Sequence, residues 1–226
     1  MTRITRRDIT VLRDLALSHV LSRDQLIELS HFGSITRANT RMRELIGLGF
    51  ARRLESPFFG QSLFMVTKQA AEVVGERIAG LIENRASSPR FVQHALSVTN
   101  VRIALQRKSS AAWRFEQQLW RKIQGSRGLE LRPDGLLIAS LPIFVEVDMG
   151  HASAPRFKER LTGYQALARS GHCQSLYGFS QFRVLVVTTG PLRSRHLRRL
   201  QPSGAEFELL VQTFDEVGAT PITPWS

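Results

Sequence analysis

The segment SITRANTRMRELIGLG, residues 34–49, is followed directly by FARRLESPFFGQSLFMV, residues 50–66. In the first segment the apolar residues recur every three or four positions, which predicts a helix that begins at Ser34 and ends at Gly47 and Gly49. In the second segment two extended runs flank the turn SPFFG, which predicts a β-hairpin. A helix followed by a hairpin is therefore the expected centre of this part of the chain.

The residues on either side extend this pattern with three more helices. Upstream, Thr5 and Asp8 form a capping-box sequence before one helix, and Ser22 caps a second, shorter one. Downstream, Thr67 begins a helix whose apolar positions continue to Leu81. The order helix, helix, helix, hairpin, helix resembles that of winged helix-turn-helix domains.

The polar face of the predicted third helix suits DNA. Its side chains are hydrogen-bonding groups with no carboxylate before Glu44, namely Thr36, Arg37, Asn39, Thr40, Arg41 and Arg43. An α-helix fits the major groove, where Arg reads guanine and Asn reads adenine. Three further cations are expected beside the groove near phosphates: Arg52, Arg53 and Lys68. Two other interpretations stay open, an ordinary solvated helix face and a surface that contacts another protein.

The charge of the chain also favours a polyanionic partner. Its 226 residues include 31 Lys and Arg against 19 Asp and Glu, a formal net charge of +12, although a GC-rich genome also enriches arginine. The 42% apolar fraction is typical of a globular protein, and no apolar run approaches the ~18 residues of a membrane span. Cys173 is the only cysteine, which excludes an intrachain disulfide. We expect a cytoplasmic protein with no membrane partner, because the N-terminus also lacks a signal-peptide pattern.

The second part of the chain, residues 90–226, alternates between strands and helices. Its strands are expected at 113–120, 129–138, 143–148, 182–187 and 207–211. Helices are expected at about 154–170 and 191–201, and one at 90–108 could pack on either domain. The polar stretch 83–89 separates this part from a first domain at residues 1–85. The fold class is therefore α+β, with an N-terminal winged helix-turn-helix followed by an α/β domain built on a mixed sheet.

Acidic residues follow two neighbouring strands of this second domain. Asp134 comes directly after Pro133, and Glu146 and Asp148 lie about a dozen residues later on the next strand. Adjacent strands would bring Asp134 and Glu146 side by side, and paired carboxylates usually bind a divalent cation such as Mg²⁺. Glu116 could complete the set, so the predicted metal ligands are Glu116, Asp134 and Glu146. The alternative is an ordinary Pro-Asp-Gly turn beside a solvated strand edge.

This arrangement resembles the PD-(D/E)xK nuclease superfamily, whose restriction-endonuclease-like fold the second domain would then share. Such nucleases cleave phosphodiesters with a metal-activated water, while a lysine stabilises the developing charge. The position two residues after Glu146 holds Asp148 instead of that lysine, and the cations Lys158 and Arg160 lie on the following helix. The resemblance implies a catalytic set of Asp134, Glu146, Asp148, Lys158 and Arg160, with Mg²⁺ required only if the domain is active.

The chain as a whole resembles the replication-relaxation family. The resemblance rests on the winged-helix pattern together with Arg132-Pro133-Asp134-Gly135, Phe144-Val145-Glu146-Val147-Asp148 and Arg160-Leu161-x-x-Tyr164. It implies an association with plasmids and other mobile elements, and a fold related to plasmid mobilisation relaxases. Members of the family tend to have Lys where Arg160 stands, and Arg does not donate a proton at neutral pH.

Three functions from different classes are therefore considered, the first of them being the main expectation. The first is a mobile-element protein that binds duplex DNA through its winged helix, with a nuclease-like domain that either grips the DNA or nicks it in a metal-dependent reaction. The second is a DNA-binding regulator whose nuclease-like domain is catalytically inactive and either forms a homodimer or holds DNA. The third is a module that binds another protein. A cation bound by Asp134 and Glu146 would favour the enzyme, whereas a salt bridge from either to Arg160 would favour the regulator.

The basic run 193–199 is either a phosphate-contacting surface or solvated charge.

Overall fold

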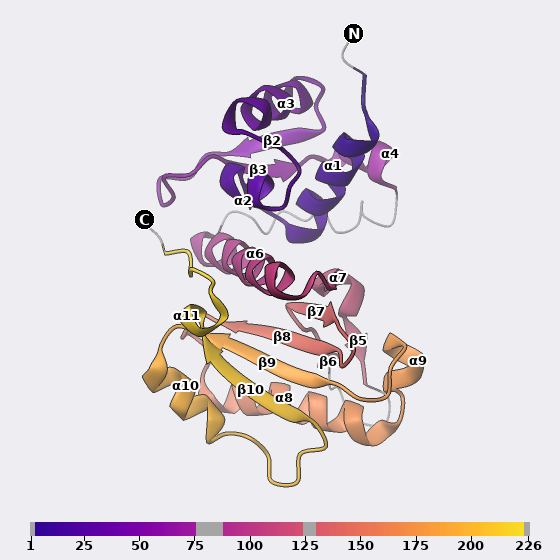
Figure 1. The fold of residues 1–226 in the computed structure, drawn as a ribbon, viewed down its shortest axis with the longest axis vertical. Coiled ribbons are helices and arrows are strands. Elements are labelled where there is room, and N and C mark those ends of the chain that lie inside the picture. Colours follow the sequence, from indigo (N-terminus) through magenta and orange to yellow (C-terminus); the bar gives the residue numbers. More distant parts are fainter. Residues whose placement is uncertain (1–2, 76–87, 124–129, 224–226) are drawn as a thin grey trace. The chain divides into compact units, whose positions relative to one another are not determined.

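A computed structural model of the protein describes residues 3–75, 88–123 and 130–223 (Figure 1). The chain divides into two compact units, one of residues 1–103 with 222–226 and one of residues 104–221. Both helices and strands contribute to each unit, and the larger sheet is mixed. The predicted α+β class with a mixed sheet is confirmed.

The first unit contains the predicted helices and hairpin. Its elements are α1 (Arg6–Ser18), β1 (Leu21–Ser22), α2 (Arg23–Glu28), α3 (Ile35–Gly47), β2 (Ala51–Leu54), β3 (Leu63–Val66), a 3-10 turn η1 (Lys68–Ala70), α4 (Ala71–Val74) and most of α6 (Pro89–Ser109). The hairpin strands pair antiparallel, and β1 joins them in a sheet of order β1-β3-β2. The helix after the hairpin ends at Gly75, and its predicted continuation to Leu81 lies outside the described residues.

Local side-chain chemistry fixes the ends of these helices. Thr5 and Asp8 form the predicted capping box, with the Thr5 amide donating to Asp8 Oδ2 at 2.7 Å. Ser34 accepts a hydrogen bond from the Arg37 amide at the start of α3. Gly49 follows α3 with φ of 79°, and a Cβ there would lie 2.4 Å from the Gln69 side chain. Glycine is therefore needed where the chain turns from α3 into β2.

Three polar contacts attach α6 to the other helices of the first unit. Gln25 Nε2 donates to Leu96 O at 2.8 Å and to Asn100 Oδ1 at 2.7 Å, and Arg102 forms an ion pair with Asp14. The division between the units consequently falls inside α6, at residue 103. The sequence placed it in the polar stretch 83–89, most of which lies outside the described residues. Contacts between residues so far apart in sequence leave no local pattern, which is why α6 could not be assigned to a unit beforehand.

The second unit is built on a five-stranded sheet of order β10-β9-β8-β7-β4. Its strands are β4 (Ala112–Phe115), β7 (Gly135–Ile138), β8 (Ile143–Asp148), β9 (Arg183–Thr188) and β10 (Glu208–Thr213). The last three are parallel, whereas β7 pairs antiparallel with both β8 and β4. The remaining elements are α7 (Glu116–Leu119), β5 (Arg121–Lys122), β6 (Glu130–Leu131), α8 (Ala154–Ser170), α9 (Cys173–Tyr177), α10 (Pro191–Arg198) and α11 (Phe214–Val217).

Two predicted strands differ from those in the structure. The strand expected at 113–120 ends at Phe115, where the side chain of Gln118 accepts from the Phe115 amide and starts the single turn α7. The strand expected at 129–138 is two separate strands, because β6 pairs with β5 in a small sheet of its own. Gly135 begins the second of them, and a Cβ at Gly135 would lie 1.9 Å from the Trp113 ring.

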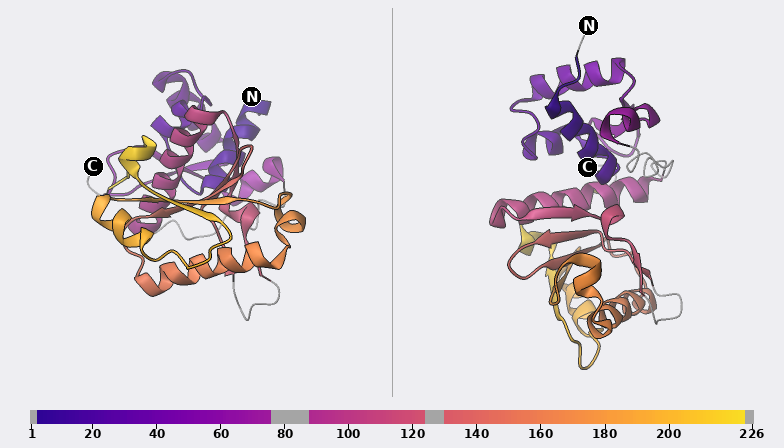
Figure 2. Two further views of the ribbon diagram at one scale, coloured as in Figure 1. Left: turned by 60° about the horizontal axis from the view of Figure 1, so that its bottom comes forward. Right: turned by 90° about the vertical axis from the view of Figure 1, so that its right-hand side faces the viewer.

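The helices α8 and α10 cover one face of the five-stranded sheet (Figures 1 and 2). Phe144 is fully buried on this face, with its ring centroid 5.4 Å from that of Tyr164 on α8 and 5.1 Å from that of Phe182. Because side chains alternate along a strand, Glu146 and Asp148 of β8 project to the same face as Phe144. The sheet thus places both carboxylates under the covering helices.

Candidate nucleic-acid interface and carboxylate cluster

The outer face of α3 carries most of the polar side chains that the sequence predicts for DNA binding. Those of Thr36, Arg37, Thr40 and Arg43 are exposed, and Asn39 is half-buried. The opposite face packs Ala38, Met42 and Leu45 into the core of the first unit. The amphipathic spacing of α3 therefore separates an apolar, buried face from a polar, solvent-facing one.

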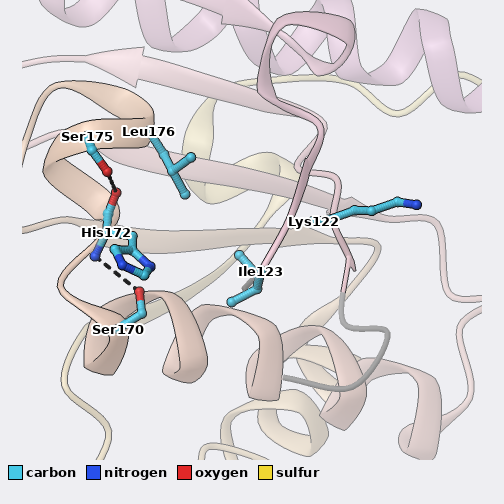
Figure 3. A pocket seen from close by; sticks show the side chains of 6 residues that line it. All are labelled: Lys122, Ile123, Ser170, His172, Ser175 and Leu176. Atoms are coloured by element: carbon cyan, nitrogen blue, oxygen red, sulfur yellow. Dashed lines mark hydrogen bonds between the residues drawn. The ribbon is translucent and has the colours of Figure 1, made fainter. Parts of the chain in front are cut away.

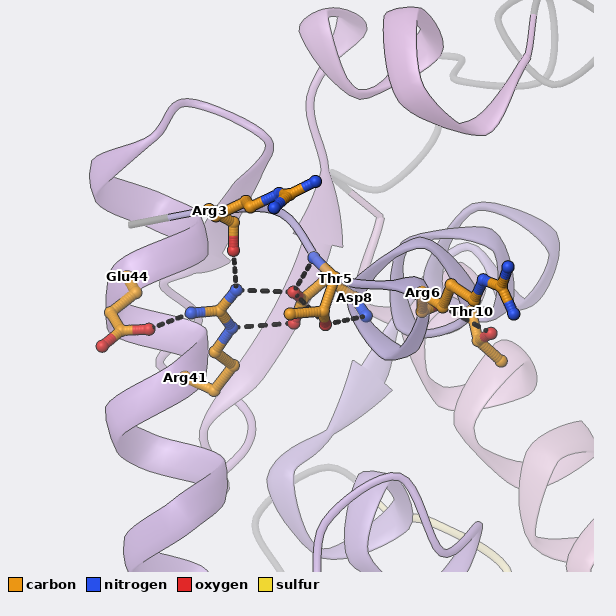
Figure 4. Close-up of polar contacts among 7 residues, drawn as sticks. All are labelled: Arg3, Thr5, Arg6, Asp8, Thr10, Arg41 and Glu44. Atoms are coloured by element: carbon orange, nitrogen blue, oxygen red, sulfur yellow. Dashed lines mark hydrogen bonds and ion pairs between the residues drawn. The ribbon is translucent and has the colours of Figure 1, made fainter. Parts of the chain in front are cut away.

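Arg41 lies apart from this face, in an ion-pair network between α3 and α1 (Figure 4). Its guanidinium donates to Asp8 Oδ1 at 2.7 Å and to Asp8 Oδ2 at 2.5 Å, and it also binds Glu44 and Arg3 O. Burial by itself would raise the pKa of Asp8, but hydrogen bonds from Arg41 and Thr5 lower that pKa to about 2. Arg41 thus joins two helices in this structure, with its charge directed toward α1.

The cations of the hairpin are exposed and loosely held. Arg53 lies 3.3 Å from Glu55 across an ion pair whose two side chains are 55% and 80% exposed. Such a pair is worth little in water, so it would yield readily to a phosphate. Arg52 and Lys68 are exposed as well, although the Arg52 guanidinium contacts Met65 Sδ at 3.3 Å. All three residues predicted to flank the groove are therefore accessible.

Asp134 and Glu146 are brought together, as the strand spacing predicts. The antiparallel pairing of Gly135 with Val145 places them opposite each other, and Asp134 Oδ2 accepts from the Val147 amide at 2.7 Å. Glu146 is 4% exposed, and both of its oxygens have partners on α8. Arg160 Nη1 donates to Oε2 at 3.0 Å, and the Tyr164 hydroxyl donates to Oε1 at 2.7 Å.

Asp148 lies on the same face of β8 but binds a different helix. Arg193 of α10 donates to both of its oxygens, at 2.8 Å and 3.2 Å, and Thr188 donates at 2.8 Å. Burial raises the pKa of Asp148, yet the hydrogen bonds from Arg193 and Thr188 outweigh it and lower the pKa below its ordinary value. The carboxylate is therefore held ionised by its own cation.

The negative charges of these acids combine to raise the pKa of one cation, Arg160. The charge of Glu146 raises the pKa of Arg160 above its ordinary value, and the charges of Asp134 and Asp148 add to this effect. Burial, with the neighbouring Glu146 carboxylate, raises the pKa of Tyr164 well above its usual range, so its hydroxyl stays a neutral donor. We call Asp134, Glu146, Asp148 and Arg160 the carboxylate cluster.

Two residues of the predicted catalytic and metal-binding set lie outside the carboxylate cluster. Glu116 begins α7 and forms an ion pair with Arg132. Lys158 is exposed on α8, and side chains two residues apart on a helix do not share a face, so it does not accompany Arg160. Among the described residues no group of three His, Cys, Asp or Glu is placed to hold a metal ion. As arranged, Glu146 fits a guanidinium and a hydroxyl rather than Mg²⁺.

Sequence reasoning missed three partners in this region. The sequence motif included Tyr164 without connecting it to Glu146, and Thr188 and Arg193 were not connected to the acids. The spacing of Arg160 and Tyr164, four residues apart on one helical face, was a usable signal, because it directs both side chains to one neighbouring strand. No comparable signal linked Arg193 to Asp148, which lies 45 residues away.

A separate small cavity of about 160 Å³ lies beside α9 (Figure 3). It is lined by Lys122, Ile123, Ser170, His172, Ser175 and Leu176. Its serines bind the chain itself, since Ser175 Oγ donates to His172 O at 2.9 Å and Ser170 Oγ accepts from the His172 amide. None of the predicted site residues lines it.

Comparison with known proteins gives one match. The sequence model of a family described as replication-relaxation matches residues 12–182, a stretch that includes α3, the hairpin and the carboxylate cluster. No curated protein and no solved structure matches the chain. Within the described residues, no helix has the length and apolarity needed to cross a membrane.

Proposed function

Because the chain belongs to the replication-relaxation family, we propose that it binds duplex DNA in the replication or mobilisation of a plasmid or other mobile element. The observation that carries this proposal is the outer face of α3, where Arg37 and Arg43 are exposed beside hydrogen-bonding side chains. The net charge of +12 supports a polyanionic partner. The first unit has the element order of a winged helix-turn-helix, and we interpret it as one.

In this proposal α3 enters the major groove and the hairpin lies beside it. Arg37 and Asn39 are the side chains suited to guanine and adenine edges. Arg52, Arg53 and Lys68 would contact phosphates, which hold the protein in register without reading sequence. Arg41 leaves the predicted base-reading set, because Asp8 and Glu44 already bind its guanidinium.

We further propose that the second unit holds DNA or joins two copies of the chain rather than cleaving DNA. The ion pair between Arg160 and Glu146 supports this regulator-like role, since it occupies the carboxylate that a metal would need. Metal-dependent nicking is the second candidate. One observation favours it: the sheet still brings Asp134 next to Glu146, the pair that would hold Mg²⁺ if Arg160 withdrew. Bound there, the metal would supply an activated water.

Replacing Arg37 and Asn39 with Ala should abolish sequence preference while sparing non-specific binding. Each good contact to a base edge discriminates by about 1–3 kcal/mol, so the loss of two should lower affinity for a preferred duplex, selected from a random pool, by at least about 30-fold. Affinity for random duplex should change only a few-fold. Fluorescence anisotropy with both duplexes measures the two affinities. Arg23→Ala is the control, because Arg23 is paired with Asp24 at the start of α2.

Two outcomes would contradict this assignment. If the double variant keeps its preference for the selected duplex, α3 does not read bases. If the wild-type chain binds no duplex even at low salt, where counterion release favours binding most, the DNA-binding proposal itself fails.

Supercoiled plasmid should stay intact with the wild-type chain in Mg²⁺ or Mn²⁺. The reason is that Arg160 and Tyr164 occupy both oxygens of Glu146. Gel electrophoresis of the plasmid, with and without chelator, is the measurement. Arg160→Lys is the informative variant. It introduces the residue expected from the family resemblance, whose ammonium group is more compact than a guanidinium. Nicking by the wild type that disappears in Asp134→Ala and in chelator would establish the second candidate instead.

A further inference from the structure

The short helix α10 carries two kinds of arginine. Arg193 and Arg198 bind other parts of the second unit: the first pairs with Asp148, and Arg198, although exposed, donates from Nη2 to Val211 O at 2.7 Å. Arg195 and Arg199 are exposed, and the side chain of neither forms an ion pair or hydrogen bond with any residue that the structure describes. Two of these four arginines thus bind the rest of the second unit through their side chains, and the side chains of the other two have no polar partner in the described part of the chain.

The outward arginines share one face of α10. His196 is also exposed, and residues 195, 196 and 199 recur at the spacing that places side chains on one side of a helix. Arg199 follows the helix with φ of −69° and ψ of −13°, so it continues the same helical path. Ser194 and Leu197 are buried on the opposite side. Arg195 and Arg199 are therefore about 6 Å apart along the helix axis.

Folding alone does not account for this face. Two like charges four residues apart on a helix repel each other, and no carboxylate is paired with either one in the described part of the chain. Cations near the end of a helix do interact favourably with its dipole, but Arg198, which is bound to Val211 O, already supplies one there. A cationic face kept free of acids is what a polyanion requires.

We propose that the outer face of α10, formed by Arg195, His196 and Arg199, is a second DNA-contacting surface that binds phosphates without reading sequence. The proposal rests on the proposed DNA-binding function and adds a contact from the second unit to that of α3. Charge complementarity identifies the occupant: duplex DNA carries one negative charge per ~1.7 Å of its axis, and guanidinium groups pair with phosphate oxygens. Binding through phosphates alone would raise affinity for every sequence equally.

The test is binding of the full chain to a labelled random-sequence duplex across a range of salt concentrations. Arg195→Ala with Arg199→Ala removes two phosphate contacts, so the slope of log affinity against log salt should fall by about 2. Affinity at ~0.1 M salt should fall roughly 10- to 100-fold. Arg195→Lys with Arg199→Lys keeps the charges and should bind within a few-fold of the wild type. Thermal unfolding followed by circular dichroism verifies that each variant is folded.

Arg169→Ala with Arg183→Ala is the matched control. It removes the same net charge from the same unit, but these arginines are already paired, with Glu206 and Glu208 respectively. The control should therefore lose little affinity. The proposal is overturned if the control loses as much as the Arg195 and Arg199 pair, or if that alanine pair binds with the wild-type slope. Absence of any binding by the wild type would overturn the proposed function as well, and so is distinguishable from failure of α10 alone.

Discussion

Asp14→Ala is expected to lower the free energy of unfolding by about 3–5 kcal/mol, the usual cost of breaking a buried ion pair from one side. The Asp14 carboxylate is 8% exposed and accepts two hydrogen bonds from Arg102, at 2.6 Å and 3.1 Å. His31 Nε2 lies 2.9 Å away and Ser18 Oγ donates at 3.0 Å. Without Asp14, the Arg102 charge, itself only 12% exposed, loses this partner. Chemical denaturation at neutral pH, followed by circular dichroism, measures the loss.

Glu55→Ala is the control for this prediction. It also removes a carboxylate paired with an arginine, but the pair is exposed and should cost less than about 1 kcal/mol. Similar losses in the two variants would show that burial of Asp14 contributes nothing. A second readout comes from acid: burial raises the pKa of Asp14, but His31 and Arg102 outweigh it and lower the pKa from 3.8 to about 2. Its stabilisation is therefore full above about pH 4 and is lost as the pH falls toward 2, and Asp14→Asn should flatten that part of the stability curve.

Glu146→Ala is expected to destabilise the second unit by about 2–3 kcal/mol, because it leaves the Tyr164 hydroxyl without its acceptor in the core. Tyr164 is fully buried and donates to Glu146 at 2.7 Å. Arg160 adds less to the loss, since 42% of its side chain is exposed and water can solvate the freed guanidinium. The matched control is Glu206→Ala, which breaks an exposed pair with Arg169. Equal melting temperatures for the two variants would contradict the prediction.

Arg160→Ala separates the two accounts of the carboxylate cluster. Removing the guanidinium leaves the buried Glu146 carboxylate beside Asp134 with less positive charge nearby. If the cluster retains the capacity of a metal site, added Mn²⁺ should raise the melting temperature of Arg160→Ala and leave that of the wild type unchanged. If neither protein responds to Mn²⁺, the cluster is an ion-pair network only.

The parts of the fold that the sequence predicted correctly depend on the spacing of residues that are close together in the sequence. The apolar spacing of 34–49 and the two extended runs of 50–66 gave α3 and the hairpin, because burial of one face dictates that spacing. The pairing of Asp134 with Glu146 followed from the rule that consecutive strands tend to be neighbours. The roles of the outer face of α3 and of the carboxylate cluster stay predictions, since neither the fold nor the family match tests them.

The parts that could not be predicted depend on which distant residues meet. Arg41 has the same local pattern as Arg37, and only the position of Asp8 on another helix distinguishes them. Nothing in the sequence around Asp148 indicates its ion pair with Arg193, which lies on α10. The turn α7 interrupts an extended-looking run because one side chain, that of Gln118, captures a backbone amide. The first two are contacts between distant residues, and the third is a local side-chain cap that the extended-looking run conceals.

The first unit is discontinuous in sequence, and this bears on the order in which the protein is made. Its helix α6 contributes Arg102 to Asp14, and the amide of Ile222 donates to Ser97 Oγ at 3.0 Å. During synthesis, N-terminal regions usually fold first. Here α3 and the hairpin can form early, but the packing around Ser97 is completed only after the ribosome has translated Ile222. The nascent chain therefore carries an incompletely packed first unit until all of residues 104–221 have been synthesised.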